Sequence, residues 1–170
     1  THGHDDVMGA LPYLLKQIKT DVYATPFTSL VISKVLKKNR ISGVKIKTVK
    51  AGDTRRIGGR NVIFIPLTHS YPQAYGFGLK TANGSIVYSG EFIEDYDDLE
   101  DAYRSNYSVL NKFAKDGVFI LMQDSKGADR NGHTSPLHRV SPNFNRVLNE
   151  NEHRRIFVEI YTQSVYRIQE

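Results

Sequence analysis

The 170-residue sequence contains no cysteine, which excludes disulfide bonds and thiolate zinc sites together. Histidine, aspartate and glutamate are therefore the strong metal ligands that remain. The composition suits a reducing cytoplasm, where we expect the protein to work. There is also no run of eighteen apolar residues and no charged-then-apolar leader, so we expect neither a membrane span nor a signal peptide.

The overall composition, with 39% apolar and 24% charged residues, predicts a soluble globular protein. Its length suits one domain, or most of one domain plus part of another. Because the chain opens on Thr1 directly inside a motif, we expect that an N-terminal piece of the natural protein is missing.

Charge is distributed unevenly around a net value of +5. Residues 34–60 contain ten Lys or Arg and one acid, whereas residues 91–101 contain seven acids and no base. Such a basic segment favours a phosphate-bearing partner through counterion release. A solvated helix face followed by a solvated strand explains the basic segment equally well.

Two helices are expected in the first part of the chain. Apolar residues recur at helical spacing within 8–19, and Pro12 is tolerable there only near the first turn. A second helix is predicted from Pro26 to about Asn39, with Thr25 as its cap.

Strand and helix patterns alternate along the rest of the chain. The clearest is a hairpin across 75–90, where Asn83-Gly84 supplies the positive φ of a tight turn. The other expected strands are 44–49, 61–67, a buried strand over 117–124 and 155–161, and the other expected helices lie within 97–115 and after Ser141-Pro142. This alternation predicts an α/β or mixed sandwich fold.

Six side chains of metal-ligand type fall on loops that leave strands or open helices. Neutral imidazoles and carboxylates of this kind suit zinc or manganese, with one open position for an activated water. These candidate residues are His2, His4, Asp6, His69, Glu91 and Asp124.

Each candidate also has a structural interpretation. His2 and His4 would serve as capping or surface residues, and Asp6 as an acid favoured at a helix N-terminus. Glu91 would be a solvated acid, and Asp124 would end a strand through side-chain hydrogen bonds. His133 and His138 lie in a loop, and we interpret them as surface residues or RNA contacts rather than ligands.

Five segments, in order along the whole chain, resemble successive signatures of the ribonuclease J family. They are "THGHDDVMGALPYLL", "THSYPQAYG", "IVYSGEF", "QDSKGADRNGHT" and "TQSVYRIQE". The resemblance implies an α/β fold, a metallo-β-lactamase-type αββα sandwich truncated at its N-terminus, over residues 1–134. It implies the beginning of an inserted β-CASP domain over 135–170, with the remaining parts of both domains outside this chain.

The family pattern implies a role for most of the candidates. His2, His4 and His69 match the residues that hold the first metal ion, and Asp6 matches a ligand of the second. Asp124 matches the acid that opens the β-CASP motifs and assists at the active site.

Two positions depart from the family pattern. Val7 replaces a second-metal ligand and has no lone pair to donate. Glu91 stands where a bridging Asp is expected and extends the carboxylate by about 1.5 Å, against a tolerance for metal distances of about 0.2 Å. The sequence therefore predicts one metal site rather than two, a degeneracy that resembles the low-activity second paralogue of Firmicutes-type bacteria.

The resemblance implies RNA processing by a metal-dependent phosphodiesterase, with 5′-to-3′ exonuclease and endonuclease action in the family and weakened chemistry here. Asp6, Glu91 or Asp124 would handle protons. One alternative is a non-catalytic RNA-binding subunit that partners an active ribonuclease J paralogue or forms a homo-oligomer. Another is a hydrolase of the same fold that acts on a thioester or lactam, which the "DSKGADR" and "SVYRIQE" segments disfavour.

Overall fold

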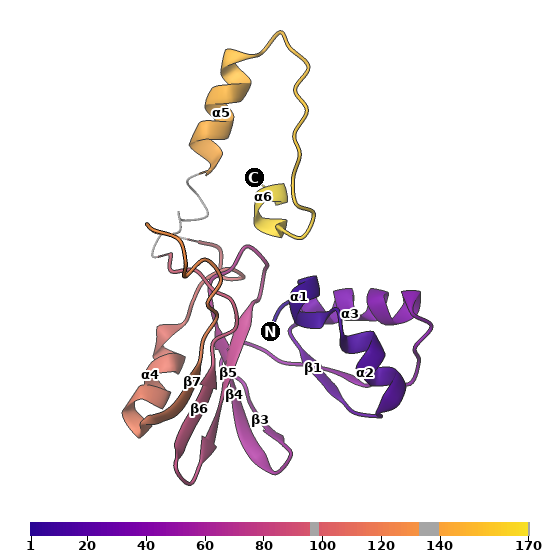
Figure 1. Ribbon diagram of the computed structural model, residues 1–170, viewed down its shortest axis with the longest axis vertical. Coiled ribbons are helices and arrows are strands. Elements are labelled where there is room, and N and C mark those ends of the chain that lie inside the picture. The colour runs from indigo at the N-terminus through magenta and orange to yellow at the C-terminus, as the bar shows by residue number, and fades with distance from the viewer. Residues whose placement is uncertain (96–98, 133–139, 170) are drawn as a thin grey trace.

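The computed structural model describes residues 1–95, 99–132 and 140–169, and its strands form two sheets (Figure 1). The small sheet pairs β1 (Val22–Ala24) and β2 (Ile46–Thr48) in parallel. The large sheet has the order β3 (Thr54–Ile57), β4 (Arg60–Pro66), β5 (Tyr75–Thr81), β6 (Gly84–Tyr88) and β7 (Val118–Met122). Its strands are antiparallel except for β7, which runs parallel to β6. The predicted α/β class is confirmed.

Helices flank the large sheet on two sides, and others lie beyond its upper end in the view of Figure 1. Those beside the small sheet are α1 (Asp5–Met8), α2 (Leu11–Gln17) and α3 (Pro26–Lys38). The others are α4 (Tyr107–Asp116), which packs on β4 and β6, then α5 (Val140–Glu150) and α6 (Val165–Gln169). None of the helices in the described ranges is long and apolar enough to cross a membrane.

The helix expected over 8–19 is in fact two short helices. Gly9 ends α1, with its N–H donating to the carbonyl of Asp5, and the chain restarts as α2 with Pro12 in the first turn. Proline is tolerated there because the first amides of a helix have no intrahelical acceptor. The second predicted helix is confirmed as α3, and the Thr25 hydroxyl accepts a hydrogen bond from the Thr28 N–H.

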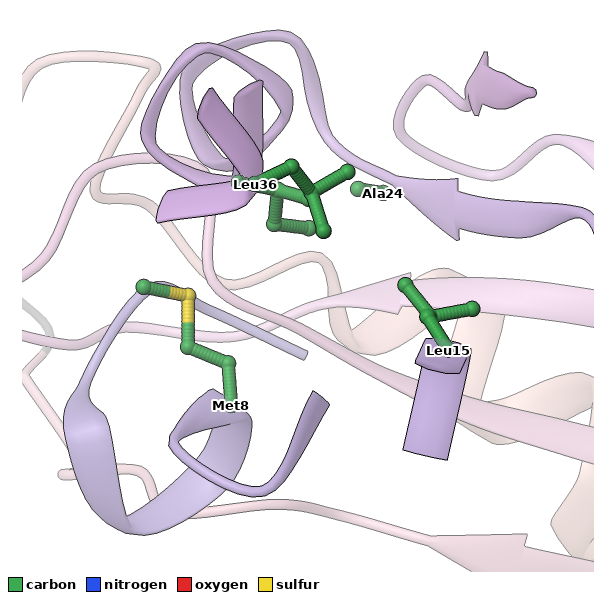
Figure 2. Packing of buried hydrophobic residues seen from close by; sticks show 5 residues of the cluster. Met8, Leu15, Ala24 and Leu36 are labelled. Atoms are coloured by element: carbon green, nitrogen blue, oxygen red, sulfur yellow. The ribbon is translucent and has the colours of Figure 1, made fainter. Parts of the chain in front are cut away.

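One apolar cluster joins α1, α2, β1 and α3 (Figure 2). It comprises Met8, Leu15, Ala24, Ile32 and Leu36, each at most 7% exposed. Burial of the methionine, leucine and isoleucine side chains stabilises the native state by roughly 1.5–3 kcal/mol each. The cluster fixes α1, and with it the chain that precedes α1, against the rest of the protein.

The predicted hairpin forms between β5 and β6, with Thr81 paired to Gly84 across the turn. Gly84 carries the positive φ, at 115°, whereas Asn83 does not. A second glycine, Gly78, lets α4 pack closely, because a Cβ there would lie 2.4 Å from the ring of the fully buried Phe113.

Three expected elements differ from the structure. The strand predicted as buried over 117–124 is β7, whose five side chains are all exposed, because no described element other than β6 packs extensively against it and its faces are left uncovered. Residues 155–161 form no strand, since no described strand lies beside them to complete a ladder. The helix expected within 97–115 begins only at Tyr107, after Asn106 accepts a hydrogen bond from the Ser108 N–H.

The remaining expectations concern the end of the chain. The helix expected after Ser141-Pro142 is confirmed as α5, which begins at Val140. The proposed domain boundary at 134/135, together with His133 and His138, falls outside the described residues.

Candidate metal centre

Three imidazoles from two distant segments meet at one point. His2 and His4 precede α1, and His69 follows β4. The ring centroids lie 4.6 Å apart for His2 and His4, 4.3 Å for His2 and His69, and 4.9 Å for His4 and His69. All three residues are buried, with exposed fractions of 8% or less.

Glu91, just beyond β6, completes the group. Its Oε2 lies 3.9 Å from Nε2 of His2 and 3.6 Å from Nε2 of His69. His2, His4, His69 and Glu91 each offer one nitrogen or oxygen atom, and these four atoms all lie within 4.8 Å of one another. The four side chains could therefore hold a metal ion together.

Local backbone contacts bring these side chains together. The carbonyl of Thr1 accepts a hydrogen bond from the Tyr75 N–H, which ties the N-terminal segment to β5. Gly3 lies between the two histidines because a Cβ there would be 2.0 Å from the Tyr71 hydroxyl oxygen. On the other side, the Tyr71 N–H donates to Nδ1 of His69 at 3.1 Å, which orients that ring.

The hydrogen bonds of the rings indicate which nitrogens are free to bind a cation. Nε2 of His4 donates to the carbonyl of Gln163 at 3.0 Å, so the lone pair of the neutral ring is on Nδ1. Nε2 of His2 is buried and has no hydrogen-bond partner in the described chain. An unpaired buried nitrogen is costly, and a metal ion would satisfy it. Nδ1 of His69 accepts the Tyr71 N–H, so binding of an ion through Nε2 of this ring would require the other tautomer and loss of that hydrogen bond. By residue type, three imidazoles and a carboxylate fit zinc or manganese.

Burial sets the protonation of the cluster. Desolvation, assisted by the neighbouring imidazoles, lowers the pKa of His2 to about 2 and that of His69 to about 4. Partial burial of Glu91 acts to raise its pKa, but the hydrogen bond from Lys126 and the charges nearby lower the pKa overall. At neutral pH the rings of His2 and His69 are therefore neutral, and the Glu91 carboxylate is ionised.

A cavity of about 360 Å³ adjoins this cluster. Its lining residues are His4, Asp6, His69, Ser70, Glu91, Lys126, Tyr161, Ser164 and Arg167. The cavity is polar on several sides and opens beside the imidazoles, so a substrate group could approach a bound ion from here.

The other predicted residues are outside the four-residue group. Asp6 is exposed and lines the polar cavity, while Val7 lines a separate, mostly apolar cavity together with Met8 and Leu11. Asp124 follows β7, and its carboxylate accepts a hydrogen bond from the backbone N–H of Lys126 at 3.2 Å.

Sequence reasoning missed two features of the site. The first is the hydrogen bond at 2.7 Å that Nζ of Lys126 donates to Oε1 of Glu91. The second is the contact of the C-terminal segment with the site. The Gln163 carbonyl accepts from His4, and the Tyr166 N–H donates to the Ser70 carbonyl at 3.1 Å. Lys126 and Gln163 belong to "QDSKGADRNGHT" and "TQSVYRIQE", so these two motifs were the available signal. A backbone carbonyl acceptor leaves no mark in a sequence.

The basic segment 34–60 lies elsewhere. All ten of its Lys and Arg residues are exposed, and none lines the polar cavity. Some of its charge is paired locally. Nζ of Lys47 lies 2.6 Å from Oδ2 of Asp21, and Nη2 of Arg55 lies 2.8 Å from Oδ2 of Asp53.

Comparison with known proteins gives a consistent set of relatives. The whole chain matches Ribonuclease J 2 of Staphylococcus saprophyticus at 32% identity over 171 residues, and that of Staphylococcus epidermidis at 33% over 175 residues. Ribonuclease J 2 of Staphylococcus aureus is 31% identical over 175 residues. The chain spans 30% of the length of each of these relatives. No family model matches the chain.

Similar solved structures include Zn²⁺-bound PqqB from Methylobacterium extorquens, with 18% identity and a TM-score of 0.46 over 57% of this chain and 39% of that one. A diphosphatase from the PhnP family has 19% identity and a TM-score of 0.38 over 72% of this chain and 57% of the other.

Proposed function

Because the chain is a ribonuclease J family relative, we propose that it takes part in RNA processing or degradation as a metal-dependent phosphodiesterase. In this proposal residues 1–134 are part of a metallo-β-lactamase domain and residues 135–170 begin a β-CASP domain. The proposed reaction is cleavage of RNA in the cytoplasm, either by 5′-to-3′ exonucleolytic degradation or by endonucleolytic cleavage, the two activities of the family.

The observation that carries the proposal is the convergence of His2, His4 and His69 around a buried, unpaired imidazole nitrogen. These three residues and Oε2 of Glu91 would hold one zinc or manganese ion. A bound ion of this kind supplies an activated water for attack on a phosphodiester.

The surrounding residues orient the substrate and handle protons. Asp6, on the cavity wall, is the exposed carboxylate in position to take up a proton from the attacking water. Asp124 contacts the Lys126 backbone and holds the loop that carries this lysine. Ser70 and Arg167, also on the wall, offer a hydroxyl and a guanidinium to phosphate oxygens.

The test uses the full-length protein. We expect bound zinc or manganese, together with degradation of a 5′-monophosphorylated RNA in manganese, and loss of both in His2→Ala. His153→Ala is the matched control, because this histidine is exposed and outside the cluster. Absence of metal, with cleavage no greater than that of His2→Ala, rejects the enzymatic proposal.

A second candidate is a non-catalytic RNA-binding subunit of an active ribonuclease J paralogue or of a homo-oligomer. It is favoured because Val7 offers no ligand and Asp6 is outside the four-residue group, so a second ion is poorly supported. This candidate predicts that wild type and His2→Ala stimulate the active paralogue equally. A stimulation that depends on His2 argues against it.

A further inference from the structure

Lys126 connects the imidazole cluster to the wall of the polar cavity. Its Nζ donates to Oε1 of Glu91 at 2.7 Å, whereas Oε2 of the same carboxylate faces the rings of His2 and His69. One carboxylate thus has one oxygen on the imidazole cluster and the other on an ammonium group.

The ammonium also lies among the other acids of the site. Asp6 and Asp124 both act electrostatically on Lys126, and Asp6 lines the same cavity. Asp124 additionally accepts the backbone N–H of Lys126, which fixes the start of this side chain. The ammonium of Lys126 therefore contacts one carboxylate, that of Glu91, and two further carboxylates contribute negative charge near it.

We propose that Lys126 is a built-in cation that stands where a second metal ion would otherwise be required, and that it binds a phosphate oxygen of the RNA. The inference rests on the proposed function and deepens it by naming a substrate-binding residue of the same site. Glu91 would offer Oε2 to a metal ion held by the imidazoles, while its Oε1 accepts the hydrogen bond from the ammonium of Lys126.

The exposure of Lys126 fits this role. Its side chain is 67% exposed, so the ammonium keeps donors free for a ligand after its bond to Glu91. Lysine binds phosphate as a point charge, and Arg167 lines the same cavity and offers further donors. As an exposed ion pair, the contact with Glu91 would contribute only about 0–1 kcal/mol to stability.

The first experiment measures RNA binding without cleavage in the full-length protein, using a single-stranded phosphorothioate RNA. We expect Lys126→Met to weaken binding about tenfold and to reduce the salt dependence of log K by about 0.7. Lys126→Arg should retain most of the affinity. The control is Lys112→Met, an exposed lysine on α4. If Lys126→Met and Lys112→Met bind this RNA alike, the proposal is overturned.

The second experiment counts manganese by equilibrium dialysis. We expect about one ion for wild type and Lys126→Arg, and binding of a further ion at least tenfold tighter in Lys126→Met, because Glu91 and Asp6 lose their competing cation. Overlapping binding curves for wild type and Lys126→Met contradict the proposal. Neither readout depends on cleavage, so failure of the nuclease activity leaves both interpretable.

Discussion

Nε2 of His4 lies 3.0 Å from the carbonyl oxygen of Gln163, which is 159 residues further along the chain. This hydrogen bond selects the tautomer of the imidazole and orients the ring, as partners of metal-binding histidines generally do. The C-terminal segment is thus part of the site although it contributes no metal ligand.

Displacing that segment should weaken metal binding. Ser164, beside Gln163, is buried at 9% exposure and lines the polar cavity, so the long side chain of Ser164→Arg should fill part of this cavity and disturb the segment. We expect a loss of about tenfold in zinc affinity, measured by competition with a chelating dye. Thr162→Arg is the matched control, because Thr162 is exposed. Equal zinc affinities for the two variants would show that the hydrogen bond has no role in binding.

Gly3 should tolerate no side chain. A Cβ there would meet the Tyr71 hydroxyl, so Gly3→Ala must displace either the ring or the segment that carries His2 and His4. We expect a loss of about 1–3 kcal/mol in the free energy of unfolding, as for other overpacked sites. Chemical denaturation of Gly3→Ala, Tyr71→Ala and the double variant tests this. The two effects should be clearly less than additive, and simple additivity contradicts the steric explanation.

The metal-free protein should become less stable as the pH is lowered below about 6.5. The pKa of His69 is about 4 in the folded protein and about 6.5 in the unfolded chain, and that of His2 is lower still. Between pH 6.5 and 4 the unfolded chain therefore binds more protons, so folding stability is lost as the pH decreases. For His69 alone the loss approaches about 3 kcal/mol at pH 4.

Denaturant unfolding between pH 7.5 and 4 measures this slope. His69→Gln should flatten the acid limb, whereas His153→Gln, which removes an exposed histidine, should leave it unchanged. If the unfolding free energy of both variants decreases equally steeply towards pH 4, groups other than His69 cause the acid sensitivity.

Phe113 should be essential to the attachment of α4. Its ring is completely buried against Gly78, so Phe113→Ala should cost about 3–5 kcal/mol of unfolding free energy. Phe119 on β7 is 60% exposed, and Phe119→Ala should change stability by no more than about 0.5 kcal/mol. Thermal and urea unfolding of the two variants decides the point, and similar losses would mean that β7 is covered in solution.

Restoring the residue types of the family pattern should strengthen the second metal position. Val7→His adds a ligand, and Glu91→Asp shortens the carboxylate and withdraws it from Lys126. We expect the double variant to bind two manganese ions and to cleave RNA faster than wild type. Val7→Ala with Glu91→Gln is the control. A single bound ion and unchanged activity would refute the account of the lost ligand.

Local signals were sufficient for several elements. Thr25-Pro26 predicted the start of α3 because capping depends on neighbouring residues. The apolar run in β4 and the turn at Gly84 likewise identified their strands. Exposure was less predictable: β7 is as apolar as a buried strand, but its burial depends on elements that lie beside it and not on its own residues.

By itself, the sequence predicted the α/β class, which follows from the alternation of strand and helix patterns, and the similarity to ribonuclease J proteins, which follows from the order of motifs along the chain. It also singled out the residues whose chemistry suits a metal ion. Only the tertiary structure brought the side chains of His2, His4, His69 and Glu91 into one cluster. It alone also formed the hydrogen bonds from Lys126 to Glu91 and from His4 to the Gln163 carbonyl. These contacts join residues far apart in the chain, and their distances follow from packing between elements, which no local pattern encodes.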